Sequence, residues 1–291
     1  VGVPNGQLTG IQQEFVLRFG SPGVTAALTS SVPGVGALVT QAGSSGSGSV
    51  AIGARSSRSP SPVTSGGVAF DPLIGGTTTV SATIPGYLTL PTASVVVTVS
   101  APGISMSAPT VGAGLQSTGS VSLGAANHGG VTVRITSSQP QIALVSASPS
   151  VAGAAFIDVP VNNGQSNVTY YVQGVDTVTA PILVAMTATA PGFTDGTATA
   201  TVQQPALDII FLNTSPTTLS PANSFQVRIG VPNSNNTGMS QEQALSPSSV
   251  ARTATVSNSN ATSGQLIFQG GPAQSGTVPI AIQQARSPSP A

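Results

Sequence analysis

The sequence predicts an all-β protein, and three observations carry this prediction. Apolar side chains recur at every second position in many short segments, which is the period of a half-buried strand. The three-to-four-residue period of an amphipathic helix is nearly absent from the chain. The 291 residues also include 34 glycines and 24 prolines, and these turn-forming residues separate the alternating segments at short intervals.

The alternation is clearest in residues 102–204. Val131, Val133 and Ile135 alternate with polar residues that include Arg134, which gives this strand one apolar face. Further strands are expected at residues 104–107, 115–123, 142–146, 155–161, 168–172, 182–189 and 198–202, with turns at His128-Gly129-Gly130, Asn162-Asn163-Gly164, Pro191-Gly192 and Asp195-Gly196. About seven or eight short strands in roughly a hundred residues are typical of an immunoglobulin-like (Ig-like) β-sandwich.

An internal repeat sets the domain organisation. Gly2-Val3-Pro4-Asn5 recurs as Gly230-Val231-Pro232-Asn233, and Arg58-Ser59-Pro60-Ser61-Pro62 recurs as Arg286-Ser287-Pro288-Ser289-Pro290, both at an offset of 228 residues. Residues 1–63 align with residues 229–291 without a gap, and about 26 of the 63 pairs are identical. A weaker repeat relates Ala82-Thr83-Ile84-Pro85-Gly86-Tyr87 to Ala188-Thr189-Ala190-Pro191-Gly192-Phe193. Self-similarity of this kind indicates a tandem array.

The repeats predict three Ig-like β-sandwich domains, at residues 1–101, 102–204 and 205–291. Val1 aligns with Ile229 and Ala291 with Val63, so we expect the first domain to lack its N-terminal part and the third its C-terminal part. Two arrangements fit this phasing. The chain is a window of a long tandem array, or it is a subunit whose end domains are completed by strands of neighbouring chains.

Two stretches of the repeated segment are predicted to be irregular. The serine-glycine run at residues 44–49 is expected to be a flexible loop. The Arg-Ser-Pro-Ser-Pro stretch is expected to be an extended connector, because proline favours polyproline II.

Composition excludes several function classes. Charged residues make up 5% of the chain, against roughly 25% in ordinary domains, and the seven arginines balance seven acidic residues. The absence of cysteine excludes disulfides and thiolate chemistry, and the absence of lysine excludes a Schiff base or a phosphate-binding P-loop. Few charges and no long apolar run predict no nucleic-acid partner and no membrane insertion. A near-neutral surface instead favours self-association with identical chains or neighbouring repeats.

Residues suited to catalysis are too sparse to form a site. The single imidazole, His128, lies in a predicted turn, and no two carboxylates lie close together in the sequence; they are Glu14, Asp71, Asp158, Asp176, Asp195, Asp208 and Glu242. We therefore predict no enzyme activity, no catalytic residue, no cofactor and no metal ligand. Calcium takes six to eight oxygen ligands, so an inter-domain Ca²⁺ bound largely by backbone and Asn oxygens stays open as an alternative.

Two kinds of surface residue are candidates for contacts or modification. Phe156 and Tyr171 fall on the polar side of their predicted strands and are expected to contact a neighbouring domain or chain. Asn-X-Ser/Thr sequences predict possible N-glycosylation in a secreted protein at Asn167, Asn213, Asn235 and Asn260.

Three further motifs carry a resemblance. Thr110-Val111-Gly112-Ala113-Gly114-Leu115-Gln116, Gly130-Val131-Thr132-Val133 and Ala190-Pro191-Gly192-Phe193 resemble the tandem bacterial Ig-like repeats of large extracellular surface, adhesin or filament proteins. The resemblance is clearest over residues 102–204. It implies an extracellular, cell-surface or secreted structural component of a filament, stalk or surface layer, with no shared catalytic residues. The alternatives are an adhesin repeat module that presents or forms a glycan- or surface-binding site, and an accessory domain of an enzyme.

Overall fold

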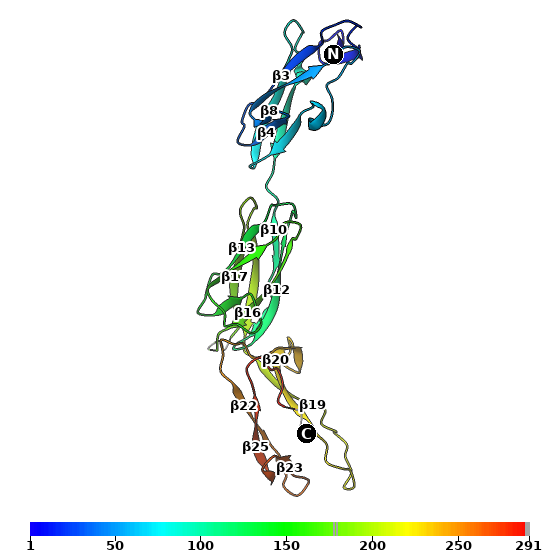
Figure 1. Cartoon of the computed structure of the whole chain (residues 1–291). Coiled ribbons are helices and arrows are strands. Elements are labelled where there is room, and N and C mark those ends of the chain that lie inside the picture. The colour runs from blue at the N-terminus through cyan, green and yellow to red at the C-terminus, as the bar shows by residue number, and fades with distance from the viewer. Residues whose placement is uncertain (177, 179, 289–291) are drawn as a thin grey trace. The chain divides into compact units, whose positions relative to one another are not determined.

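The chain folds almost entirely into β-strands. The structure is a computed structural model that describes residues 1–176, 178 and 180–288. It divides into unit 1, Val1–Ala101, and unit 2, Pro102–Ala291 (Figure 1). The described residues contain no α-helix, and no helix among them is long and apolar enough to cross a membrane. The predicted all-β class is confirmed.

Unit 2 begins with a complete two-sheet sandwich, which we call the middle sandwich (residues 102–204). Its strands are β10 (Ile104–Ser107), β11 (Thr110–Gly112), β12 (Gln116–Leu123), β13 (Val131–Ser137), β14 (Ala143–Ser146), β15 (Phe156–Val161), β16 (Asn167–Gly174), β17 (Ile182–Thr189) and β18 (Gly196–Gln203). One sheet has the order β10-β12-β16-β14 and the other β11-β18-β17-β13-β15. These orders match the A-B-E-D and G-F-C-C′ sheets of an Ig domain, except that β14, at the D position, precedes β15 in the chain. The Ig-like sandwich is therefore confirmed.

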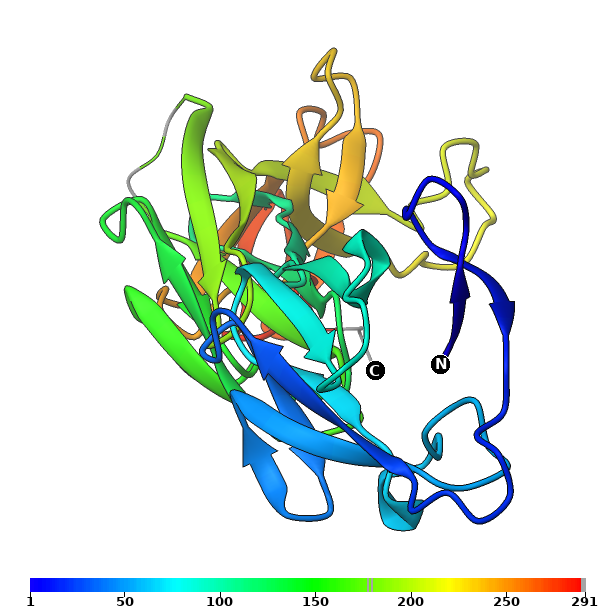
Figure 2. The same ribbon diagram turned by 90° about the horizontal axis from the view of Figure 1, so that it is seen from above.

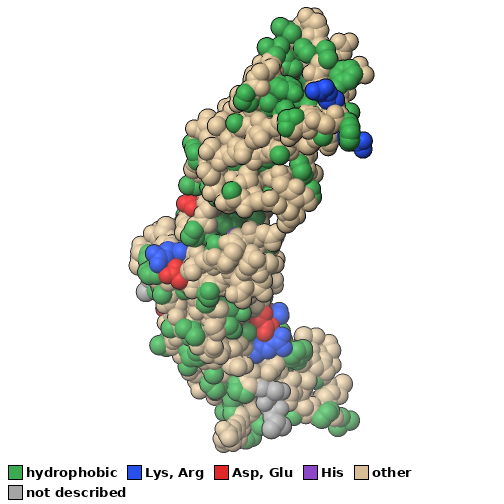
Figure 3. All heavy atoms as spheres, turned by 45° about the horizontal axis from the view of Figure 1, so that its top comes forward, with side chains coloured by type: hydrophobic (Ala, Val, Ile, Leu, Met, Phe, Trp, Pro, Cys, Tyr) green, Lys and Arg blue, Asp and Glu red, His purple; other side chains and the backbone are tan. Residues whose placement is uncertain are grey.

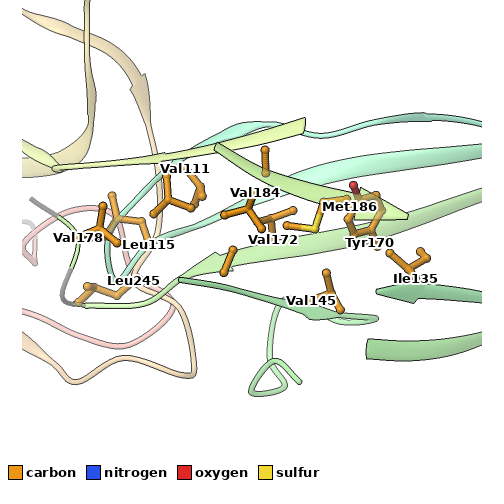
Figure 4. Packing of buried hydrophobic residues seen from close by; sticks show 14 of the residues in the cluster. Val111, Leu115, Ile135, Val145, Tyr170, Val172, Val178, Val184, Met186 and Leu245 are labelled. Atoms are coloured by element: carbon orange, nitrogen blue, oxygen red, sulfur yellow. The ribbon is translucent and has the colours of Figure 1, made fainter. Parts of the chain in front are cut away.

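Alternating side chains of both sheets form the core of the middle sandwich. Val133, Ile135, Val172, Tyr170 and Met186 are fully buried between the sheets (Figure 4). The Tyr170 hydroxyl donates a hydrogen bond to the Ser107 carbonyl oxygen at 3.0 Å, and burial raises the pKa of Tyr170 to about 12. Gly119 lies directly under this ring, where a Cβ atom would overlap it. The glycine thus allows the largest core side chain to pack flat on β12.

The rest of unit 2, residues 205–288, is the third domain. Its strands are β19 (Ala206–Ile210), β20 (Gln226–Pro232), β21 (Met239–Glu242), β22 (Arg252–Ser257), β23 (Leu266–Phe268), β24 (Gly271–Ala273) and β25 (Ser275–Ile280). They form three small sheets, β19-β20-β21, β22-β25 and β23-β24.

Unit 1 has the same arrangement of sheets as the second half of the middle sandwich. Its elements are β1 (Gly2–Pro4), β2 (Ile11–Glu14), β3 (Val24–Ser30), β4 (Gly36–Thr40), β5 (Gly43–Ser45), β6 (Ser47–Ile52), β7 (Ala69–Pro72), β8 (Gly76–Thr83) and β9 (Ser94–Val99), with 3-10 helices η1 (Val63–Ser65) and η2 (Pro91–Ala93). The sheet β6-β3-β8-β9 corresponds to β15-β13-β17-β18, and β4 pairs with β7 as β14 pairs with β16. Strands β1 and β2 form a separate sheet, drawn in darkest blue in Figure 2.

The repeat in the sequence has a residue-for-residue counterpart in strand register. Gly2 pairs with Glu14 and Gly230 with Glu242, and both ribbons shift register after the next residue. Val24 pairs with Ile52, and Arg252 pairs with Ile280. Each of these pairs is separated from its copy by 228 residues.

Two local predictions for the repeated segment are wrong. Residues 44–49, predicted as a flexible loop, lie mostly in β5 and β6, because the strands beside them supply hydrogen-bond partners that composition does not reveal. The second Arg-Ser-Pro-Ser-Pro stretch does not run free as a connector. Ser287 is buried, and its Oγ accepts a hydrogen bond from the Val227 N–H at 3.0 Å. Ser289 and Pro290 of this motif, with Ala291, lie outside the described residues.

Candidate functional site: the junction inside unit 2

The middle sandwich and the third domain share one hydrophobic core. Leu245, in the loop that precedes β22, forms an isolated antiparallel bridge with Leu115, and each side chain is only 1% exposed. Val111 and Val178 lie beside them at this end of the sandwich (Figure 4). We call the contact between residues 110–116 and 173–176 on one side and residues 243–252 on the other the junction.

Backbone hydrogen bonds flank the leucine pair. The Gln116 N–H donates to the Ala244 carbonyl oxygen at 3.0 Å, and the Ser246 N–H donates to the Gly114 carbonyl oxygen at 2.9 Å. The Leu245 backbone is held from its other side by the Gln284 carbonyl oxygen at 3.0 Å. The third domain therefore continues the backbone pairing of the middle sandwich at this point.

Two buried glutamines complete the polar part of the junction. The Gln243 side chain accepts a hydrogen bond from the Gly112 N–H at 2.9 Å and donates one to the Thr110 carbonyl oxygen at 2.8 Å. The Oε1 atom of the fully buried Gln173 accepts from the Gly153 N–H at 2.8 Å and from the Ser248 hydroxyl at 2.6 Å. Buried amides bonded on both ends fix the orientation of the two parts, because a shift would leave them unsatisfied.

An ion pair closes the rim of the junction. Arg252 lies 2.7 Å from the Asp176 carboxylate, which also accepts a hydrogen bond from the Ser249 hydroxyl at 2.9 Å. Asp176 packs against Gly114, whose φ of +75° and lack of Cβ make room for the carboxylate.

Most of the few charges in the chain are paired in the same way. Five of the seven arginines lie within 2.7 Å of a carboxylate, so blue side chains lie beside red ones on the largely uncharged surface in Figure 3; the pairs are Arg58–Glu14, Arg134–Asp158, Arg228–Asp208, Arg252–Asp176 and Arg286–Glu242. Hydrogen bonds from the arginines hold the pKa values of Glu14, Asp158 and Asp208 below their ordinary values. The charges thus act as links between neighbouring strands.

The arrangement around the single histidine is structural. The Nε2 atom of His128 lies 2.8 Å from the Gln165 carbonyl oxygen, and its Nδ1 accepts from the Gly130 N–H at 3.1 Å. Its ring packs edge-on against Phe193. In the part of the chain that the structure describes, no three His, Cys, Asp or Glu residues cluster as metal ligands would.

The predicted contact residues are not brought together. Phe156 on β15 is 47% exposed and lies under the Arg134 guanidinium at 4.5 Å, whereas Tyr171 on β16 is half-buried. The two strands belong to opposite sheets, so these aromatic side chains do not form one surface.

The four predicted glycosylation positions are all exposed, as a modified residue requires; they are Asn167, Asn213, Asn235 and Asn260. The Asn260 side chain accepts hydrogen bonds from the backbone and hydroxyl of Thr262 in its own sequon. Glycosylation stays a prediction.

Sequence reasoning missed the junction residues. Leu245, Gln243 and Gln173 lie in stretches without strand periodicity or at a strand end. One signal was available: Leu17 and Leu245 are identical at the repeat offset, although Pro247 and the polar residues around it interrupt any regular pattern.

Comparison with known proteins adds little to the assignment. No protein-family model and no curated protein matches the sequence. Among solved structures, domains 4 and 5 of the S-layer protein SbsC are 19% identical over 61% of this chain and 76% of that chain, with a TM-score of 0.25. A type II cohesin dyad from the adaptor ScaA scaffoldin of Acetivibrio cellulolyticus is 10% identical over 63% of this chain and 90% of that one, with a TM-score of 0.25. Similarity at this level carries no conclusion about function, so the fold assignment rests on the strand order.

Proposed function

We propose that this chain is a structural component of an extracellular filament, stalk or surface layer built from tandem Ig-like repeats. The junction carries this proposal. Successive domains of an extended structural protein must keep a fixed orientation, and a shared core with bonded buried amides provides this. Domains joined only by a flexible linker would lack such contacts.

The repeated register supports the same role. The ribbon and hairpin of residues 1–63 recur at 228 residues with the same strand pairs. An array grows by adding copies of such a unit, because each copy contacts its neighbours in the same way.

The surface chemistry suits self-association with identical chains or neighbouring repeats. Net charge is zero, and five arginines are neutralised by adjacent carboxylates, so little like-charge repulsion opposes lateral contact. The exposed strand faces carry threonine, serine and valine, which can pack and form hydrogen bonds between copies.

Electron microscopy of protein from its native source, combined with intact-mass measurement, tests the proposal. We expect fibres, rods or sheets. A chain much heavier than 28.4 kDa in these assemblies would indicate a continuous array, and a chain of 28.4 kDa would indicate subunits that polymerise non-covalently. Isolated globular particles would overturn the proposal. They would favour the adhesin-repeat alternative, which no observation on the two separated aromatic residues supports at present.

A further inference from the structure

One strand of the third domain has a neighbour on one side only. In the described part of the chain, β22 pairs with β25 and with no other strand. Its counterparts in the two other domains are central: β3 lies between β6 and β8, and β13 lies between β15 and β17. The open edge of β22 therefore occupies the position that β8 fills in unit 1.

The backbone groups along this edge are set for pairing. The Ser31 N–H donates to the Thr79 carbonyl oxygen in unit 1, and the Ser138 N–H donates to the Ala185 carbonyl oxygen in the middle sandwich, both at 2.9 Å. Ser259 is the same residue at the repeat offset. Antiparallel alternation places the N–H groups of Thr255 and Ser257 on this edge with that of Ser259.

The side chains needed by the missing neighbour are also present. In unit 1 the Thr29 hydroxyl lies 2.8 Å from the Ser81 hydroxyl, and the Ser31 hydroxyl accepts from the Thr79 N–H at 2.8 Å. The counterparts of Thr29 and Ser31 are Ser257 and Ser259, which keep the hydroxyl groups and are exposed.

An open space on the adjoining face gives a second, independent sign. In unit 1 the Phe70 ring of β7 lies so close to Gly36 that a Cβ atom there would overlap it. The third domain keeps glycine at the matching position, Gly264, yet a Cβ atom there would meet nothing closer than 4.0 Å. Leu38 is 2% exposed beneath Phe70, whereas its counterpart Leu266 is half-buried. Both Phe70 and β8 belong to residues 64–101.

We propose that the edge of β22 and the face at Gly264 form an acceptor site for a segment of the 64–101 type. The seated segment would place a β8-like strand on β22 and an aromatic ring on Gly264. We commit to a segment joined in the same polypeptide behind the Ser-Pro-Ser-Pro stretch, because unit 1 carries it there. The biological meaning of this inference rests on the proposed function, but the site itself is defined by strand pairing.

The test extends the full chain after Ala291 with a second copy of residues 64–101. Hydrogen–deuterium exchange of β22 is then compared between the extended and the original chain. We expect the amides of Thr255, Ser257 and Ser259 to exchange about tenfold more slowly, or slower still, in the extended chain, because they gain partners. Exchange in unit 1 and the middle sandwich is the internal reference and should not change.

Two matched variants of the extended chain act as controls. Ser81→Pro in the appended copy removes a strand donor, and Gly264→Val fills the space for the ring; both should return the three amides toward fast exchange. Fast exchange in the extended chain without these substitutions would overturn the acceptor site.

A further arm tests the source of the segment. The original chain is mixed with a free peptide of residues 64–101. We expect little slowing at micromolar peptide, because the tether and its high effective concentration are absent. Slowing equal to that of the extended chain would overturn the committed source and make the site a docking surface for separate chains. None of these results depends on fibre formation, so the inference and the proposed function fail separately.

Discussion

Unit 1 and the third domain contain the same folded segment in two surroundings. The register of β3 with β6 is that of β22 with β25, yet Gly36, Ala37 and Leu38 are buried, whereas Gly264 and Gln265 are exposed. Strand pairing is thus specified by the 63-residue segment itself. Burial depends on a second segment, residues 64–101, that covers it.

The comparison reverses at the other end of the segment. Leu245 is buried in the junction, and Leu17, its copy, is only half-buried. The same leucine is therefore a core residue where a neighbouring sandwich covers it and a partly exposed one where unit 1 alone surrounds it.

The largest expected effect separates these two leucines. Leu245→Ala should lower the free energy of unfolding of unit 2 by about 3 kcal/mol, because a fully buried side chain leaves a cavity. The matched variant Leu17→Ala should cost unit 1 about 1 kcal/mol. Urea unfolding followed by hydrogen exchange, which reports on each unit separately, measures both. Equal losses would mean that the junction is not a core.

The next effect separates the two glycines. Gly36→Val should destabilise unit 1 by about 2 kcal/mol, since the Phe70 ring must move. Gly264→Val should change the stability of unit 2 by less than about 0.5 kcal/mol, as expected for an exposed position. The same exchange measurement applies, and a large loss at Gly264 would show that its face is already covered.

The smallest effect concerns the repeated ion pair. The hydrogen bond from Arg58 lowers the pKa of Glu14 below its ordinary value of 4.5. A lowered carboxyl pKa stabilises the folded state above that ordinary value, and this contribution is lost as the pH falls through the folded-state pKa. Glu14→Gln should therefore flatten the acid side of the stability profile of unit 1, as measured by thermal unfolding between pH 2 and pH 7.

The corresponding substitution in the third domain sharpens the comparison. Glu242 is 24% exposed and lies near Arg228 as well as Arg286, whereas Glu14 is 42% exposed and pairs with Arg58. Glu242→Gln should consequently cost more stability at pH 7 than Glu14→Gln. A profile that Glu14→Gln leaves unchanged would show that the exposed pair contributes nothing.

Sequence periodicity predicted the middle sandwich well because its strands alternate cleanly. β13, β16 and β17 lie within a few residues of their predicted positions. The short parallel strand β11 was missed, since three residues carry no readable period. The glycine-serine hairpin was missed because its strands depend on pairing with β3 and β4 rather than on intrinsic preference.

The junction lay beyond sequence reasoning for a related reason. Gln173 and Gln243 matter through partners that lie 75 and 133 residues away. A polar residue with such distant partners looks like any surface glutamine in the sequence. Only the repeat, which pairs Leu17 with Leu245, hinted that the loop before β22 holds a buried residue.

The pairing of each cation with an adjacent anion has a consequence for the setting in which such a protein can work. Fields from close pairs cancel over distances shorter than the screening length of about 10 Å in 0.1 M salt. Contacts between these surfaces therefore owe little to ionic strength, and we expect assemblies of this chain to keep their strength in fresh water and in brine alike.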